Sequence, residues 1–204
     1  SVWEKMGKPK IFNFIELGPG DGSLTKVIIK TIKKFPELNK AIKIYLYEKS
    51  VFLKKLQKQN IDNKRIKWIK NFSSIKKGPV IFFGNEFFDA IPIKQFSNIN
   101  NELFEKYYSV KNKINIIEKF IKSDEKDMTQ IKKFETLKKL KFIEFPKKGF
   151  LELNPIIKKI NKLSGGILLI DYGYLNENNS NTIQAVMDNK KISTETMLKN
   201  LGKA

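Results

Sequence analysis

Asn85, Glu86 and Asp89 stand in the segment G-N-E-F-F-D-A-I-P, among phenylalanines and aliphatic residues that follow an apolar run. Burial among apolar side chains disfavours the charged form of a carboxylate unless a partner compensates for the lost water. A cationic ligand would be such a partner, so we predict that Glu86 and Asp89 are catalytic residues that bind a positively charged substrate group. The structural alternative is that Glu86 caps the following turn and Asp89 faces water.

Few other catalytic groups are present in the chain. The sequence contains no cysteine and no histidine. Thiol and imidazole catalysis, disulfides and zinc sites with the usual ligands are therefore excluded within this chain, and we predict no metal. Any chemistry must use carboxylates, tyrosines, hydroxyls, lysines or a bound cofactor.

A glycine-rich turn follows the first predicted strand. Residues 11–24, I-F-N-F-I-E-L-G-P-G-D-G-S-L, contain an apolar run and then Gly18, Gly20 and Gly22 at alternate positions. Glycines allow a tight turn and a close approach of the backbone to a ligand, and Ser23 can cap a helix whose free N–H groups favour an anion. The turn predicts a nucleotide-type site, with a structural strand-to-helix turn and a nicotinamide or flavin site as alternatives.

The spacing of the glycines in this turn limits which nucleotide-type ligand is expected. The dinucleotide pattern G-x-G-x-x-G would require glycine at position 23, whereas this chain has E-x-G-x-G-x-G beginning at Glu16. Glu48 closes the next predicted strand, where a carboxylate can accept both hydroxyls of an unphosphorylated ribose. The chain here resembles the first two motifs of class I S-adenosylmethionine-dependent methyltransferases. We therefore predict S-adenosyl-L-methionine as cofactor.

Asn71 and Phe72 follow a third predicted strand. The ends of successive parallel strands meet at one edge of an open α/β sheet, so both side chains can approach the adenine, by a hydrogen bond and by stacking respectively. A loop asparagine and a core phenylalanine are the equally favoured alternative.

Strands and helices alternate along most of the chain, which predicts an α/β fold with a Rossmann-like doubly wound sheet. The predicted strands are 11–17, 42–48, 66–69, 80–83 and 167–172, with an edge strand at 182–186, and the predicted helices are 24–35, 50–59 and one that begins at Pro155.

Residues 98–149 interrupt this alternation. They contain a predicted hairpin at 103–120, a lysine-rich helix or loop at 123–139 and a strand at 141–145. We predict one domain over 1–204, with its core at 10–97 and 150–187, an insertion at 98–149 that contributes substrate contacts, and a weakly patterned tail at 188–204.

The amino-acid composition limits which classes of binding partner are expected. The 204 residues are 41% hydrophobic and carry a formal net charge of +19. Almost all of the positive charge is lysine, dispersed along helices as on solvated faces, and Arg65 is the sole arginine. Phosphate-reading surfaces favour arginine, so nucleic acid is not the predicted partner. No apolar run approaches the roughly 20 residues that cross a bilayer, so we expect a soluble protein with no membrane insertion.

Several motifs together resemble one family, the MidA-like or DUF185 family of S-adenosylmethionine-dependent methyltransferases. The resemblance covers nearly the whole chain in order and rests on E-L-G-P-G-D-G-S-L, G-N-E-F-F-D-A-I-P-I-K-Q-F, E-L-N-P, G-G-I-L-L-I-D-Y-G-Y and N-T-I-Q-A-V.

The resemblance implies roles for particular residues. Glu86 and Asp89 would face the methyl-accepting site, and the implied cofactor contacts are Gly18, Gly20, Gly22, Glu48 and Asn85. We further predict cofactor contacts at Glu16, which begins the glycine motif, and at Asn71 and Phe72. Lys94 stands where the family usually has a histidine, so that side chain is not an indispensable base here. The family's N-terminal G-D-F-x-T-S-P-E-I region and its C-terminal part are missing from this sequence.

The mitochondrial members of this family assist complex I assembly by dimethylating an arginine on a subunit of that complex. The resemblance therefore implies a protein arginine methyltransferase that acts on a respiratory complex I subunit, in the bacterial cytoplasm or, in a eukaryote, in the mitochondrial matrix. An RNA or DNA base methyltransferase and a non-catalytic assembly factor remain as alternatives. The sequence carries no signal for an oligomeric state.

Overall fold

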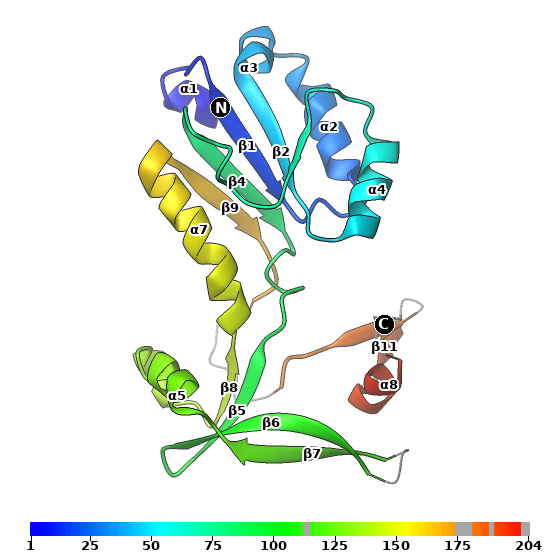
Figure 1. Ribbon diagram of the computed structural model, residues 1–204, viewed down its shortest axis with the longest axis vertical. Coiled ribbons are helices and arrows are strands. Elements are labelled where there is room, and N and C mark those ends of the chain that lie inside the picture. The colour runs from blue at the N-terminus through cyan, green and yellow to red at the C-terminus, as the bar shows by residue number, and fades with distance from the viewer. Residues whose placement is uncertain (112–114, 174–180, 188–189, 201–204) are drawn as a thin grey trace. The chain divides into compact units, whose positions relative to one another are not determined.

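The computed structural model of the protein describes residues 1–111, 115–173, 181–187 and 190–200 (Figure 1). It contains two compact units. The first, here called the core unit, comprises residues 1–92 and 148–173, and the second, the insertion unit, comprises residues 93–147 and 174–204. Within the described residues, no helix is both long and apolar enough to span a membrane.

The core unit is built on a five-stranded parallel sheet in the order β3-β2-β1-β4-β9. Its strands are β1 (Phe12–Leu17), β2 (Ile42–Tyr47), β3 (Lys67–Ile69), β4 (Val80–Asn85) and β9 (Gly165–Ile170). The chain moves from β1 outward to β3 and then returns to β4 on the other side of β1. In open α/β sheets, ligands bind at such a reversal of strand order, here at the carboxyl ends of β1 and β4.

Helices cover both faces of this sheet (Figure 1). The helices of the core unit are α1 (Val2–Lys5), α2 (Ser23–Ile32), α3 (Pro36–Ala41), α4 (Val51–Asn60) and α7 (Lys147–Leu163). Side chains on a strand alternate between the two faces. On β2, Ile44 and Leu46 accordingly face a cluster that includes Ile29 of α2, while Tyr45 and Tyr47 face the opposite cluster, which includes Ile156 of α7.

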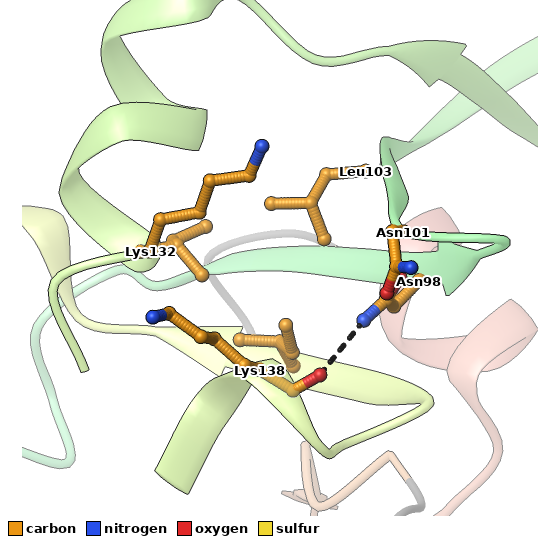
Figure 2. Close-up of a pocket in the computed structure, with 7 residues that line it drawn as sticks. Asn98, Asn101, Leu103, Lys132 and Lys138 are labelled. Carbon is orange, nitrogen blue, oxygen red and sulfur yellow. Dashed lines mark hydrogen bonds between the residues drawn. The ribbon is translucent and has the colours of Figure 1, made fainter. Parts of the chain in front are cut away.

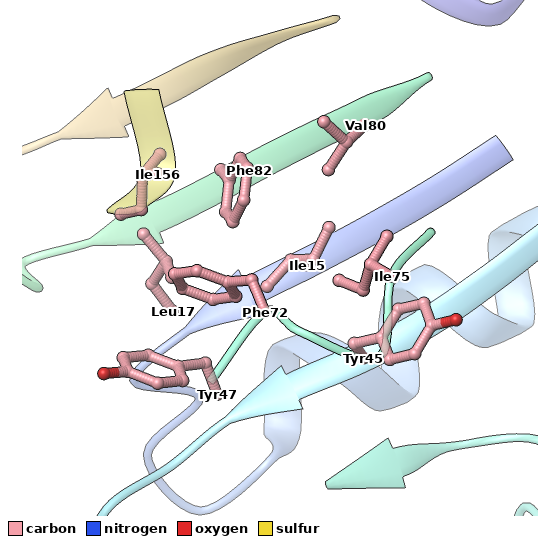
Figure 3. Packing of buried hydrophobic residues seen from close by; sticks show 9 residues of the cluster. All are labelled: Ile15, Leu17, Tyr45, Tyr47, Phe72, Ile75, Val80, Phe82 and Ile156. Atoms are coloured by element: carbon pink, nitrogen blue, oxygen red, sulfur yellow. The ribbon is translucent and has the colours of Figure 1, made fainter. Parts of the chain in front are cut away.

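The cluster on the α7 face is the larger core of this unit (Figure 3). Ile15, Val80, Phe82 and Ile156 in it are completely buried. Burial of a large apolar side chain stabilises by about 1.5–3 kcal/mol, so this cluster holds β1, β4 and α7 together.

The insertion unit contains a four-stranded antiparallel sheet in the order β7-β6-β5-β8 and a separate two-stranded ribbon. Its elements are β5 (Lys94–Ile99), β6 (Glu102–Lys111), β7 (Asn115–Lys122), α5 (Glu125–Ile131), α6 (Glu135–Lys138), β8 (Phe142–Phe145), β10 (Ala185–Met187), β11 (Lys190–Ile192) and α8 (Thr194–Lys199). The predicted hairpin is present as β6 and β7, although part of its predicted turn lies outside the described residues.

A buried acid holds the insertion unit together. Asp127 is completely buried, and its carboxylate accepts hydrogen bonds from Lys94, at 2.6 Å, and from Lys147. Lys94 also binds Glu105 at 2.9 Å. Lys94 is therefore part of an ion-pair network that joins β5, β6 and α5.

Three predicted elements differ from the structure. Helix α7 begins at Lys147, not at Pro155, because Glu152 in its first half binds Tyr47 and Lys49 and holds the earlier residues in the helix. The predicted edge strand at 182–186 begins only at Ala185 and pairs with β11. Thr182 instead donates its backbone N–H to the Glu144 carboxylate at 3.0 Å.

The third difference concerns β9. The sequence predicts a buried strand, but Leu168, Leu169 and Ile170 are 55%, 40% and 52% exposed. Among the described residues β9 lies at the edge of the parallel sheet, which explains this exposure.

The packing at the start of β9 predicts that two adjacent glycines differ in how well they tolerate replacement by alanine. A Cβ on Gly165 would lie 1.8 Å from the carbonyl oxygen of Val80, whereas a Cβ on Gly166 would meet its nearest neighbour at 3.9 Å. Gly165 also has φ +137°, which strains any other residue. Gly165→Ala should therefore destabilise the protein by about 2 kcal/mol or more in thermal or urea unfolding. Gly166→Ala is the matched control, and equal stability of the two variants would contradict this packing.

Candidate functional site

The glycine turn between β1 and α2 has an open side and a packed side. Gly18, Gly20 and Gly22 all have left-handed φ values, of 60°, 56° and 86°. A Cβ on Gly18 would lie 3.0 Å from Phe87, and a Cβ on Gly22 would lie 2.7 Å from Ile61, but a Cβ on Gly20 would meet nothing within 4 Å. Two glycines thus permit close packing, and the backbone at Gly20 is open to a ligand.

The start of α2 differs from the prediction. Gly22 is the N-cap residue, and Ser23 is already helical and does not cap the helix. Asp21 accepts hydrogen bonds from both the backbone N–H and the hydroxyl of Ser23, at 2.9 and 2.7 Å. The local turn is therefore fixed by Asp21.

Glu48 lies beside the glycine turn. The Gln57 amide donates to the carbonyl oxygen of Gly20 at 2.7 Å and to the Glu48 carboxylate at 3.1 Å. The other oxygen of Glu48 accepts the backbone N–H of Ser50 at 2.8 Å. One glutamine side chain thus joins the proposed ribose acceptor to the proposed cofactor turn.

Gln57 is a site residue that sequence reasoning missed. It is completely buried on α4 and also accepts a hydrogen bond from the Trp68 indole at 2.9 Å. Helical periodicity alone would favour apolar residues on the buried face of this helix, but Val51 is 84% exposed. The sequence signal for Gln57 was its position one helical turn after Leu53, which places both residues on the same face of α4.

Glu16 is buried at the end of β1. Its side chain accepts a hydrogen bond from the hydroxyl of Thr25, which is itself completely buried on α2. Burial raises the pKa of Glu16, and the Thr25 hydrogen bond offsets part of that rise. The hydrogen bond between Glu16 and Thr25 therefore joins β1 to α2 next to the glycine turn.

The second carboxylate group lies at the carboxyl ends of β4 and β9. Asn85 ends β4, and the backbone N–H of Glu86 donates to the carbonyl of Ile170 at 2.8 Å. Partial burial, followed by the charges of Asp171 and Glu86, raises the pKa of Asp89. Asp171 and Glu86 therefore lie close enough to Asp89 to disfavour its charged form. The described residues contain no group of three or more potential ligands placed to hold a metal ion.

The environment of these acids differs from the prediction in one respect. Glu86 and Asp89 are exposed, so they are not embedded among apolar side chains. Phe87 turns inward between them, onto Gly18 and onto Tyr47, whose ring centroid is 6.3 Å away. Partial burial of Asp89 and its repulsion by Asp171 and Glu86 therefore remain the reasons why a cation would be favoured here.

Asp171 is a further residue of this group. Its carboxylate accepts the backbone N–H of Phe88 at 3.3 Å and that of Tyr172 at 3.0 Å. It thereby fixes the loop that carries Asp89. The sequence signal was its position at the end of an apolar strand.

Asn71 and Phe72 lie at the end of β3. Phe72 is buried in the core, with its ring 4.9 Å from that of Tyr47 and 5.0 Å from that of Phe82, which is the alternative that the sequence left open. The side-chain amide oxygen of Asn71 accepts hydrogen bonds from the backbone N–H and the hydroxyl of Ser73, and Asn71 lines a pocket of about 360 Å³. Asn71 is therefore accessible to a ligand, whereas most of the Phe72 ring is covered.

A family model for S-adenosyl-L-methionine-dependent methyltransferases matches residues 1–204. The chain belongs to this methyltransferase family. The family predicted from the motifs is confirmed.

Named relatives in this family are arginine methyltransferases. Protein arginine methyltransferase NDUFAF7, mitochondrial, of Xenopus laevis is 23% identical over 201 residues, which cover 87% of this chain and 46% of the relative. The Caenorhabditis elegans homologue, also mitochondrial, is 27% identical over 210 residues, 90% of this chain and 48% of the relative. The chain spans about half the length of these curated relatives.

Two solved structures confirm the fold. A COG1565 superfamily protein from Burkholderia thailandensis bound to S-adenosyl-homocysteine has a TM-score of 0.62 at 14% identity, over 85% of this chain and 44% of that chain. A native structure of a COG1565 superfamily protein from the same organism has a TM-score of 0.63 at 15% identity, over 85% and 46%. The predicted Rossmann-like α/β fold is therefore correct.

The buried Glu16 predicts a pH-dependent stability. Its pKa in the folded protein lies above the ordinary value of 4.5, so from about that pH upward the folded protein retains a proton that the unfolded chain releases. Stability is therefore lost as the pH rises through the folded pKa. Glu16→Gln should remove this loss while keeping an acceptor for Thr25.

Thermal unfolding from pH 4 to 8 measures the effect. The variant should gain a few degrees over the parent at the upper end and nothing at the lower end, because about 1 kcal/mol shifts the midpoint by about 2–4 °C in a chain of this size. The exposed Glu37→Gln is the control. A gain that is independent of pH would show that Glu16 is not the group that titrates.

Proposed function

We propose that this protein transfers a methyl group from S-adenosyl-L-methionine to a guanidinium nitrogen of an arginine in a protein substrate. The observation that supports the proposal is the contact between Phe87 and Gly18, which brings the loop that carries Glu86 and Asp89 to the glycine turn. The names of the relatives support arginine as the acceptor. The substrate that the resemblance implies is a respiratory complex I subunit, with the enzyme in the mitochondrial matrix or in the bacterial cytoplasm.

The residues around the turn fit the cofactor. Gly20 presents an open backbone, and Glu48 is held next to it through Gln57. Glu48 would accept the ribose hydroxyls, and Asn71 and Asn85 would contribute polar contacts. When bound, S-adenosyl-L-methionine supplies an electrophilic methyl group on a sulfonium. The contribution of the protein is then chiefly alignment, which can supply about 7–11 kcal/mol.

The acids fit a guanidinium. Arginine is a poor nucleophile because its lone pairs are delocalised and its pKa exceeds about 12. Glu86 and Asp89 would bind it by charge-assisted hydrogen bonds, localise its positive charge on the nitrogens that they contact and receive the departing proton. Partial burial and the charges of Asp171 and Glu86 raise the pKa of Asp89, which suits this carboxylate to receive that proton.

The two alternatives have weaker support. Amino-group methyltransferases that act on bases often have an N-P-P-Y-like loop after the same strand, but Glu86 stands here in the place of a proline. A non-catalytic assembly factor would not need an open backbone at Gly20 beside Glu48. This last alternative predicts no affinity for the cofactor.

Calorimetry with S-adenosyl-L-methionine tests cofactor binding. The parent protein should bind it, and Glu48→Gln should weaken the affinity about tenfold or more, because hydrogen bonds to a charged group contribute about 1.5–3 kcal/mol. Glu37→Gln, whose carboxylate is 71% exposed and pairs with Lys8, is the matched control. An unchanged affinity of Glu48→Gln would remove Glu48 from the site.

A methyl-transfer assay tests whether Glu86 binds the methyl-accepting arginine. Glu86→Gln keeps the size of the side chain but removes its charge, so we expect cofactor affinity to be retained and turnover on an arginine-containing protein to fall by about a hundredfold or more. Radiolabelled methyl incorporation measures turnover, with Glu37→Gln as control. Unchanged methylation by Glu86→Gln would show that the acceptor is bound elsewhere.

A further inference from the structure

The insertion unit contains a pocket of about 250 Å³ that the proposed chemistry does not use (Figure 2). We call it the insertion pocket. Seven residues line it: Asn98, Asn101, Leu103, Ile131, Lys132, Lys138 and Ile143. All of them belong to the insertion unit, so the pocket is defined without reference to the core unit.

The inner wall of the insertion pocket is aliphatic. Leu103, Ile131 and Ile143 come from β6, α5 and β8 and are only 4%, 1% and 1% exposed. A cavity of roughly 150 Å³ already holds benzene, and sites for drug-sized molecules begin at about 300 Å³. The insertion pocket therefore suits one bulky apolar side chain.

The rim of the insertion pocket is polar and positively charged. Figure 2 shows Lys132 and Lys138 on one side and Asn98 and Asn101 on the other. The seven described lining residues include two lysines and no acid. Lys138 forms an exposed ion pair with Glu135, whereas Lys132 forms no ion pair within the described part of the chain. An occupant with a negative charge next to its apolar group would complement this rim.

The insertion pocket is held in shape before any ligand arrives. The side chain of Asn98 donates to the carbonyl of Lys138 at 3.2 Å, which ties α6 to β5. Asn100 and Asn101 form the two-residue turn between β5 and β6, with φ values of 51° and 64°. Tight turns with two positive φ values suit the twist of a hairpin and have little freedom. Preorganisation lowers the entropic cost of binding.

We infer that the insertion pocket docks an acidic segment of a protein partner, with one bulky apolar side chain inside and a neighbouring Asp or Glu against Lys132 and Lys138. The identity of this partner as the methylated protein rests on the proposed function. The pocket would then select substrates by a feature other than the target arginine. Such a site gives the insertion unit a role in recognition.

Methyl NMR of the whole protein tests this inference with a defined probe. The probe is the tripeptide N-acetyl-Leu-Asp-Glu-amide, and the signals are the side-chain methyl groups of Leu103, Ile131 and Ile143. We expect saturable shifts with a dissociation constant on the order of 1 mM, as suits one side chain and one or two charge contacts. The neutral N-acetyl-Leu-Asn-Gln-amide should bind about fivefold more weakly or worse, and added salt should reduce the difference.

A pair of double variants separates the pocket from general charge. Lys132→Gln with Lys138→Gln should weaken the acidic probe about fivefold or more. Lys133→Gln with Lys139→Gln removes the same charge from neighbouring exposed positions that do not line the pocket, and should leave binding unchanged. All four lysines are exposed, so their replacement should leave the fold intact. The methyl spectrum of each double variant checks that weaker binding does not result from unfolding.

Several results would overturn the inference. They are the absence of shifts, equal binding of the neutral tripeptide, equal weakening in both double variants, and preferential binding of octanoate or of an oligouridylate at the same methyl groups. The titration contains no cofactor and measures no methyl transfer. Its failure is therefore distinguishable from failure of the proposed function, which the calorimetry with S-adenosyl-L-methionine tests separately.

Discussion

The packing of Phe87 against the Cα atom of Gly18 is the contact on which the proposed site depends. A Cβ at Gly18 would come within 3.0 Å of the ring, so the loop after β4 can lie this close to the turn after β1 only because that residue is glycine. Phe87 also contacts Tyr47, which Glu152 of α7 fixes through a 2.7 Å hydrogen bond. Three strands and one helix thus determine where Glu86 and Asp89 lie relative to the glycine turn.

The acids of the core unit have different environments and hence different roles. Glu16 is buried and fastens α2, Glu48 is held by Gln57, and Glu86 and Asp89 are exposed near Asp171. The chain carries a formal net charge of +19, which repels a cationic substrate at long range. That repulsion is screened beyond about 8 Å at physiological ionic strength, so the local acids decide whether a guanidinium binds.

The sequence predicted the parallel strands, the glycine turn and the family because these depend on local patterns. Buried parallel strands have continuous apolar runs, and the turn has glycines at fixed spacing. The features it missed depend on contacts between distant residues. The sequence gives a weak signal for Gln57 and Asp171, and the groups that they hydrogen-bond identify them as site residues. The start of α7 at Lys147 depends on the hydrogen bond between Glu152 and Tyr47. Thr182 lies outside a strand because its backbone N–H donates to Glu144.

A crystal structure of this protein with S-adenosyl-homocysteine would test the central claim most directly. The account predicts that the ribose hydroxyls contact Glu48 and that the sulfur lies above the open backbone of Gly20, on the side of Phe87 that carries Glu86 and Asp89. A ribose remote from Glu48, or a sulfur separated from both carboxylates by the Phe87 ring, would contradict it.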